Sequence, residues 1–240
     1  MISRNIALAT ILMLVAGAAA AQVPAPPCAP AAPGQGRAGD WAFFARYRED
    51  NASLKPDGSR IIFMGDSITE GWGKEPFFAA NPHYLDRGIS GQTALQMLVR
   101  FQADVIALEP KLVHIMAGTN DVAENEGPET DEEIEGAIRS MVELSLADHI
   151  KVVLASIPPA ADFPWHPGLK PARRIRRLNA WIESYARQAG VGYVNYWPAL
   201  ATPAGAMKPA LSADGVHPNS AGYRAMAPLA QAAIAAALAR

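Results

Sequence analysis

Short apolar runs alternate with longer amphipathic segments along most of the chain. The apolar runs lie at residues 61–64, 111–118, 150–158 and 191–196, with a short extended segment at 84–88. Apolar residues at helical spacing occur at about 93–108, 130–148, 172–190 and 220–240, and a further helix is expected at 40–50. Apolar strands that are separated by helices are typical of a parallel sheet covered on both faces. The pattern therefore predicts an α/β fold with one central parallel sheet.

Local signals mark the ends of these elements. Asp40 is expected to cap the first helix, in which Trp41, Phe44 and either Tyr47 or Arg48 would lie near one face. Acidic residues open the helix at 130–148 and suit its dipole. Gly190 is expected to end the helix at 172–190. These signals support the element boundaries that the periodicity predicts.

The composition indicates one good-sized domain. The chain has 240 residues, of which 50% are hydrophobic, and a formal net charge of -2. This is enough apolar material for a substantial core, and we place the domain at residues 40–240. A nearly neutral chain without a basic, aromatic-rich stripe argues against nucleic acid as a partner.

The first residues are interpreted as a targeting segment. Arg4 precedes an apolar run, and an Ala-rich stretch ends at Ala21, so residues 1–21 are expected to be a signal peptide that is cleaved before Gln22. The alternative is an uncleaved membrane anchor, although the run is short for a membrane span. Residues 22–39 are rich in Pro, Ala and Gly, and indicate an extended linker. We expect an exported protein, periplasmic or extracellular, that is not inserted in a membrane after cleavage.

The lone cysteine, Cys28, lies in this linker and cannot form an internal disulfide. Lipid modification of Cys28 is the alternative. It fits the sequence poorly, because Pro26 and Pro27 precede the cysteine where small residues are expected.

Two parts of the sequence carry residues suited to nucleophilic catalysis. Ser67 follows the apolar strand at 61–64. Gly65 allows the chain to turn sharply at the end of this strand, and Asp66 is expected to fix the loop in place. Asp214 and His217 lie three residues apart, so a turn can bring the carboxylate to one imidazole nitrogen and leave the other nitrogen as a base. Alone, this pair is a weak signal, but a serine nucleophile needs such a base and orienting acid.

Three groups are candidates to stabilise an oxyanion. They are the backbone N–H of Ser67 at a helix start, the backbone N–H of Gly91 and the side-chain amide of Asn120. Ser67 and the motif that contains Asn120 both follow strands, and ligands bind beyond the carboxyl ends of parallel strands. We therefore expect them to meet in one crevice.

The blocks GDSIT, GISGQT, AGTND and DGVHPN resemble, in order, the four signature blocks of the SGNH or GDSL-type hydrolases. The four letters of that name fall on Ser67, Gly91, Asn120 and His217, and Asp214 matches the triad acid. The resemblance implies a flavodoxin-like three-layer α/β/α sandwich that hydrolyses carboxylic esters through an acyl-enzyme, without a metal or other cofactor. Substrates across the family include O-acetylated sugars, lysophospholipids, thioesters and aryl esters.

The sequence departs from this family at two positions. Ile68 replaces a leucine of similar volume, which should matter little. Asp86 stands where relatives often carry asparagine, which puts local hydrogen bonding in doubt. The chain has no G-x-S-x-G, which argues against the α/β-hydrolase fold.

Other residues invite rival interpretations. Ser90 is flanked by glycines, but its context favours a loop residue over a nucleophile. His114 lies within an apolar run and is expected in the core rather than at a metal, and His83, His149 and His166 are assigned no catalytic role.

Two surface features are left open. Arg173, Arg174, Arg176 and Arg177 crowd the start of one helix and form either a solvated face or an anion-binding patch. Phe163 and Trp165 either line a substrate pocket or pack at an ordinary rim.

The favoured function is a secreted serine esterase that acts on a small-molecule or saccharide ester, with short acyl groups preferred. The first alternative is a lysophospholipase or a broad acyl-ester or thioester hydrolase, although no exposed apolar helix or lid is evident. The second is an inactive glycan-binding domain, which would have no use for a nucleophile and base.

Overall fold

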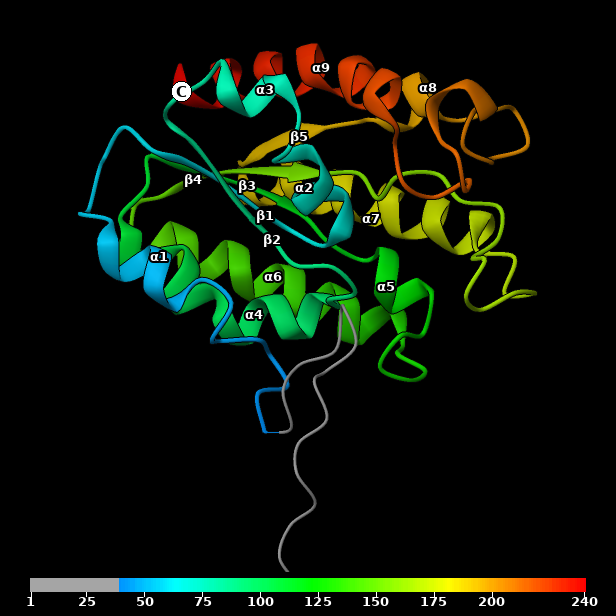
Figure 1. Ribbon diagram of the computed structural model, residues 1–240, viewed down its shortest axis with the longest axis horizontal. Helices are drawn as coiled ribbons and strands as arrows, with labels where there is room; N and C mark the ends of the chain where they lie inside the picture. The colour runs from blue at the N-terminus through cyan, green and yellow to red at the C-terminus, as the bar shows by residue number, and fades with distance from the viewer. Residues whose placement is uncertain (1–38) are drawn as a thin grey trace, which may run out of the picture.

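The computed structural model describes residues 39–240, which form a layered α/β domain (Figure 1). The sheet consists of five parallel strands in the order β2-β1-β3-β4-β5. Their bounds are β1 Ile61–Gly65, β2 Tyr84–Gly88, β3 Leu112–Met116, β4 Lys151–Ala155 and β5 Gly192–Val194. This strand order is that of flavodoxin-like folds, which confirms the predicted architecture.

Helices cover both faces of the sheet (Figure 1). One face packs against α4 (Ala94–Asp104), α6 (Asp131–Ala147) and α7 (Ala172–Ala189), and the other against α2 (Ser67–Trp72), α3 (Pro76–Ala79), α8 (Trp197–Leu200) and α9 (Ser220–Leu238). The remaining elements are α1 (Arg48–Ser53), α5 (Thr119–Val122), η1 (Ile106–Leu108) and η2 (Pro209–Leu211). The helices and the sheet make the three layers α/β/α.

The strands are buried on both faces, which explains their nearly continuous apolar sequence. All five residues of β1 and all five of β3 are buried. Side chains alternate along a strand, so Ile62 and Met64 enter the core on one side of the sheet while Ile61 and Phe63 enter the core on the other. Burial on both sides fixes the register of these strands.

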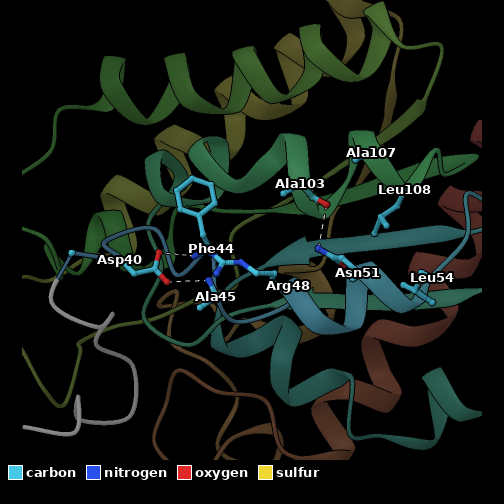
Figure 2. A pocket seen from close by; sticks show the side chains of 11 residues that line it. Asp40, Phe44, Ala45, Arg48, Asn51, Leu54, Ala103, Ala107 and Leu108 are labelled. Atoms are coloured by element: carbon cyan, nitrogen blue, oxygen red, sulfur yellow. Dashed lines mark hydrogen bonds between the residues drawn. The ribbon is translucent and has the colours of Figure 1, made fainter. Parts of the chain in front are cut away.

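The predicted bounds of the helix at 40–50 are wrong. Helix α1 begins only at Arg48, and residues 40–47 form turns in which Phe43 has a φ of 58°. Asp40 does cap, as expected, but it caps a turn: its carboxylate accepts hydrogen bonds from the N–H groups of Phe44 and Ala45, at 2.8 and 3.0 Å (Figure 2). A non-glycine residue at positive φ interrupts a right-handed helix, so helical spacing alone misjudged this segment.

A groove of about 890 Å³ separates this N-terminal segment from α4 and η1 (Figure 2). Asn51 Nδ2 spans it to the carbonyl of Ala103 at 3.2 Å. Ser67, Asp214 and His217 do not line this groove.

The predicted end of one further helix is also wrong. The helix expected at 93–108 ends at Asp104, because Val105 leaves the helical region and a short 3₁₀ turn follows.

Within residues 39–240, no helix has both the length and the apolar character needed to cross a membrane. The predicted signal peptide at 1–21, Cys28 and the linker up to residue 38 lie outside the described residues.

Candidate active site

Ser67 is held at the end of β1 by a tightly packed turn. The strand ends at Gly65, Asp66 caps α2 by accepting a hydrogen bond from Ile68 N–H at 2.9 Å, and Ser67 is the first residue of the helix. A Cβ on Gly65 would lie 2.0 Å from Thr69 Oγ1, so glycine is required here for close packing of strand and helix. The serine therefore has a fixed position at the carboxyl edge of the sheet.

Asp66 has a structural role in this turn, as the sequence indicated. Burial raises the pKa of its carboxyl to about 6, although the Ile68 N–H bond opposes this effect. Its side chain is bonded to the backbone of α2, and the hydroxyl of Ser67 is bonded elsewhere.

Ser67, His217 and Asp214 form a hydrogen-bonded series across 150 residues of sequence. Ser67 Oγ lies 2.9 Å from His217 Nε2, and His217 Nδ1 lies 2.7 Å from Asp214 Oδ2. An ionised carboxylate can only accept, so Nδ1 carries the proton and Nε2 is left to accept from the serine hydroxyl. The structure thus brings together the nucleophile, base and acid that the sequence predicts, in the tautomer that the chemistry needs.

The loop that carries this pair is anchored through Asp214. Its Oδ1 accepts hydrogen bonds from Ser212 Oγ, Val216 N–H and His217 N–H at 3.1, 2.9 and 2.8 Å. Partial burial raises the pKa of Asp214, but the hydrogen bonds from the His217 side chain and from Val216 and His217 N–H outweigh it and lower the pKa to about 2. The acid is therefore ionised at any pH at which the imidazole could act as a base.

The three predicted oxyanion donors come from three adjacent strand ends. In register, Gly65 of β1 pairs with Gly88 of β2 and with Met116 of β3, so the loops after these strands leave the sheet at one edge. Gly91 has a φ of 83°, a left-handed conformation that favours glycine. Helix α5 begins directly after Gly118, and Asn120 is its second residue.

Asn120 is buried and fully oriented by its neighbours. Its Nδ2 donates to the carbonyl of Gln92 at 3.0 Å, and its Oδ1 accepts from Asn125 Nδ2 at 2.8 Å. An amide NH₂ has two hydrogens, so one remains to meet a substrate oxygen. The Ser67 amide likewise has no partner within its own helix, because it lies in the first turn.

Buried polar side chains hold these loops together. The guanidinium of Arg100 donates to the carbonyls of Gly65 and Arg87 at 3.2 and 2.8 Å and pairs with Asp104 at 2.9 Å. Asp121 accepts from Ala94 N–H at 2.8 Å, which joins the Asn120 turn to the start of α4. The donors are thus fixed before any substrate arrives, as transition-state stabilisation requires.

Burial also raises the pKa of Asp121, and the nearby carboxyl of Glu129 raises it further. Asp121 holds the start of α4 through a carboxyl whose pKa lies above its usual range.

The rival residues lie elsewhere or are occupied. Ser90 Oγ donates to Glu70 at 2.7 Å and therefore contacts a carboxylate rather than an imidazole. His114 is fully buried, bonded through Nε2 to Tyr196 Oη at 2.9 Å, and burial lowers its pKa to about 3. It is a neutral core residue, as expected.

Three of the four arginines at the start of α7 are exposed, which agrees with a solvated face, and two of the four pair with a carboxylate rather than leaving a free anion site. Arg174 and Arg177 both pair with Asp131 at the start of α6, at 2.8 and 2.5 Å. Arg176 lies over the Trp197 ring at 5.5 Å. Asp131 supplies negative charge between the N-termini of two helices, which is why cations are tolerated there.

The two loop aromatics have different positions. Phe163 is 0% exposed and belongs to the core, so it does not line a substrate pocket, which corrects that interpretation. Trp165 packs on Phe163 at 5.3 Å, is 45% exposed, and its ring centre lies 5.8 Å from that of His217. Only Trp165 of this pair presents a surface beside the hydrogen-bonded series.

Sequence reasoning missed Gln92 and Asn125, which orient Asn120. Trp165 Nε1 also donates to Asn125 Oδ1 at 2.9 Å. Asn125 lies five residues after Asn120, in the same loop, but neither helical nor strand spacing singles out an asparagine at that distance.

Comparison with known proteins agrees with this geometry. Residues 63–225 match the GDSL-like Lipase/Acylhydrolase family. The crystal structure of a GDSL-like lipase from Bacteroides thetaiotaomicron is 46% identical, with a TM-score of 0.79 over 82% of this chain and 98% of that one. A proposed acylhydrolase from Bacteroides fragilis is 48% identical, with a TM-score of 0.80 over 83% and 99%. An acetylxylan esterase from Geobacillus stearothermophilus is 26% identical over 202 residues, 71% of this chain and 91% of its own.

Proposed function

We propose that this chain, which belongs to the GDSL-like lipase/acylhydrolase family and hydrolyses ester bonds, removes short acyl groups from saccharides. The observation that carries the proposal is the series Ser67–His217–Asp214 at 2.9 and 2.7 Å, with an exposed indole beside it. Of the alternatives, an inactive glycan-binding domain does not agree with the family assignment.

In the first half of the proposed reaction, Ser67 Oγ attacks the ester carbonyl while His217 Nε2 takes its proton. The carbonyl oxygen becomes negative and is met by the N–H groups of Ser67 and Gly91 and by Asn120 Nδ2. His217 then returns the proton to the leaving hydroxyl oxygen as the bond from the carbonyl carbon to that oxygen breaks, which leaves the acyl group on the serine.

In the second half, water takes the place of the departed alcohol. His217 removes one proton from the water as its oxygen bonds to the acyl carbon. The acyl–serine bond breaks, the proton passes to Ser67 Oγ, and a carboxylic acid is released. Asp214 remains ionised throughout and stabilises the imidazolium that forms twice per turnover.

Two features support a sugar as the alcohol part. Aromatic faces pack well on sugar rings, and Trp165 offers an exposed face 5.8 Å from the His217 ring. The similarity to an acetylxylan esterase, although only 26%, extends over most of both chains. Together they favour an O-acetylated saccharide over a long-chain lipid.

Export is part of the proposal. Residues 1–21 have the charged start, apolar run and small-residue cleavage site of a signal peptide, so the mature chain should begin at or near Gln22. N-terminal sequencing of protein recovered from the periplasm or medium tests this. A lipid-modified Cys28 at the mature terminus would show a membrane-tethered enzyme instead.

A chain-length series tests the substrate class. We expect p-nitrophenyl acetate to be cleaved with a higher kcat/KM than the octanoate or palmitate, and acetate to be released from acetylated xylan or pectin. Ser67→Ala serves as the inactive control. A kcat/KM that rises steadily with chain length, with no acetate released from either polysaccharide, would favour the lysophospholipase or broad acyl-ester alternative.

A further inference from the structure

The amide of Asn120 can stabilise an oxyanion only with its nitrogen, and not its oxygen, turned towards the substrate. The two ends of an asparagine amide have almost the same shape, so packing alone does not choose between them. The choice must come from hydrogen bonds. The carbonyl of Gln92 accepts from Nδ2 at 3.0 Å, and Asn125 Nδ2 donates to Oδ1 at 2.8 Å.

Asn125 has the same ambiguity as Asn120, and Trp165 removes it. An indole N–H can donate but never accept. Because Trp165 Nε1 lies 2.9 Å from the Asn125 side chain, the oxygen of Asn125 must face the indole and its nitrogen must face Asn120. The bonds from Trp165 to Asn125 and from Asn125 to Asn120 therefore run in the one direction that also agrees with the Gln92 carbonyl at the other end.

Asn125 also connects two of the loops that form the site. Its Nδ2 lies 3.5 Å from the carbonyl of Gly91, at the limit of a hydrogen bond, so it contacts the loops that carry both Gly91 and Asn120. Trp165, its third partner, packs beside His217. One side chain thus joins the oxyanion donors to the loop that lies against the base.

We propose that Asn125 is a positioning residue that holds the Asn120 amide with its nitrogen towards the oxyanion, and that the Trp165 indole N–H sets the direction of this pair. The inference rests on the proposed role of Asn120 as an oxyanion donor. In this role Asn125 acts through the Asn120 amide and not on the reacting atoms.

Three substitutions separate this role from a merely structural one. Asn125→Asp replaces the donor that faces Asn120 Oδ1 with a carboxylate oxygen, which favours the flipped amide. We expect kcat for p-nitrophenyl acetate to fall about a hundredfold, which approaches loss of the donor itself. Asn125→Ala removes the constraint without reversing it and should lower kcat about tenfold. Trp165→Phe keeps an aromatic side chain but removes the indole N–H and should lower kcat severalfold. KM should stay nearly constant in all three.

The double variant is the decisive measurement. In an Asn120→Ala background, Asn125→Asp should cause little further loss, because nothing remains to be oriented. Asn195→Asp is the matched control, because Asn195 is exposed, caps the backbone N–H of Trp197 and has no place in the site. It should leave kcat unchanged, and thermal unfolding of each variant monitors the fold.

The possible failures are distinguishable. If Asn120→Ala alone is silent, the proposed oxyanion role fails. A second set of outcomes overturns only this inference. In each of them Asn120→Ala lowers kcat, but the Asn125 variants either have no effect, raise KM at constant kcat, or add their full loss of kcat to that of Asn120→Ala.

Discussion

The carboxyl of Asp86 allows a quantitative prediction about stability and pH. Asp86 lies on β2, and its Oδ1 accepts a hydrogen bond from Gly88 N–H at 2.7 Å. Burial raises its pKa from 3.8 to about 7 against the effect of that hydrogen bond, and the negative charge of Glu70 adds to the increase. The folded protein therefore keeps a proton on Asp86 that the unfolded chain has already released.

The sign of the effect follows from the proton count. Between about pH 4 and pH 7, the folded state binds more protons at Asp86 than the unfolded state, so stability falls as the pH rises. A tenfold difference in proton affinity is worth about 1.4 kcal/mol, so the full effect has an upper limit of about 4 kcal/mol. Since the side chain is not completely buried, we expect about 2 kcal/mol of it to be realised.

Asp86→Asn should remove this dependence. The amide oxygen can still accept from Gly88 N–H, while the titrating charge is gone. Urea unfolding, monitored by tryptophan fluorescence, should show that the free energy of unfolding of the variant exceeds that of the wild type by an amount that grows from near zero at pH 4 to about 2 kcal/mol at pH 8. Asparagine at this position should therefore be the more stable choice at neutral pH.

The control is Asp57→Asn, on an exposed turn. Hydrogen bonds from the Ser59 side chain and backbone lower the pKa of Asp57 from 3.8, so the stability that this carboxylate contributes changes mainly below about pH 4, and the difference between this variant and the wild type should change little between pH 4 and pH 8. A stability difference for Asp86→Asn that is the same at pH 4 and pH 8 would refute the raised pKa.

Three further predictions concern the site and its support. Asp214→Asn should lower kcat/KM by about 10³- to 10⁴-fold, measured by initial rates on p-nitrophenyl acetate, because an amide NH₂ opposite Nδ1 favours the tautomer that cannot accept the Ser67 proton. Arg100→Met should lower the free energy of unfolding in urea by about 3–5 kcal/mol, because it removes the cation that pairs with the buried Asp104 carboxylate and the hydrogen bonds to the Gly65 and Arg87 carbonyls. EDTA should leave the rate unchanged, because both nitrogens of His217 are bonded within the series; loss of activity that a divalent ion restores would contradict the assignment.

Much of the fold was predictable because β1, β3 and β4 are buried on both faces and leave a clear apolar signal. Their parallel order also predicts that Ser67 and Asn120 leave the sheet at one edge. The N-terminal segment was not predictable in the same way. Its helical spacing includes Phe44, which is exposed, while positive φ at Phe43 and the side-chain bonds of Asp40 decide the local conformation.

The support of the candidate site was less accessible from the sequence. Asn125 and Gln92 act through single hydrogen bonds between loops, and a contact of that kind leaves no periodic pattern. Phe163 and Trp165 are two residues apart and both aromatic, yet one is buried and the other is exposed beside His217. Such differences depend on how the loop packs on the core and against residues 123–125, which local sequence does not determine.

The central claim is that Ser67 is the nucleophile of an acyl-enzyme reaction, and labelling tests it most directly. We expect a fluorophosphonate to inactivate the protein in a time-dependent way and to leave one adduct, found by mass spectrometry on the peptide that contains Ser67. Folded Ser67→Ala should take up no label and lose esterase activity by at least about a thousandfold. An adduct on another serine such as Ser90, or turnover by Ser67→Ala close to that of the wild type, would contradict the claim.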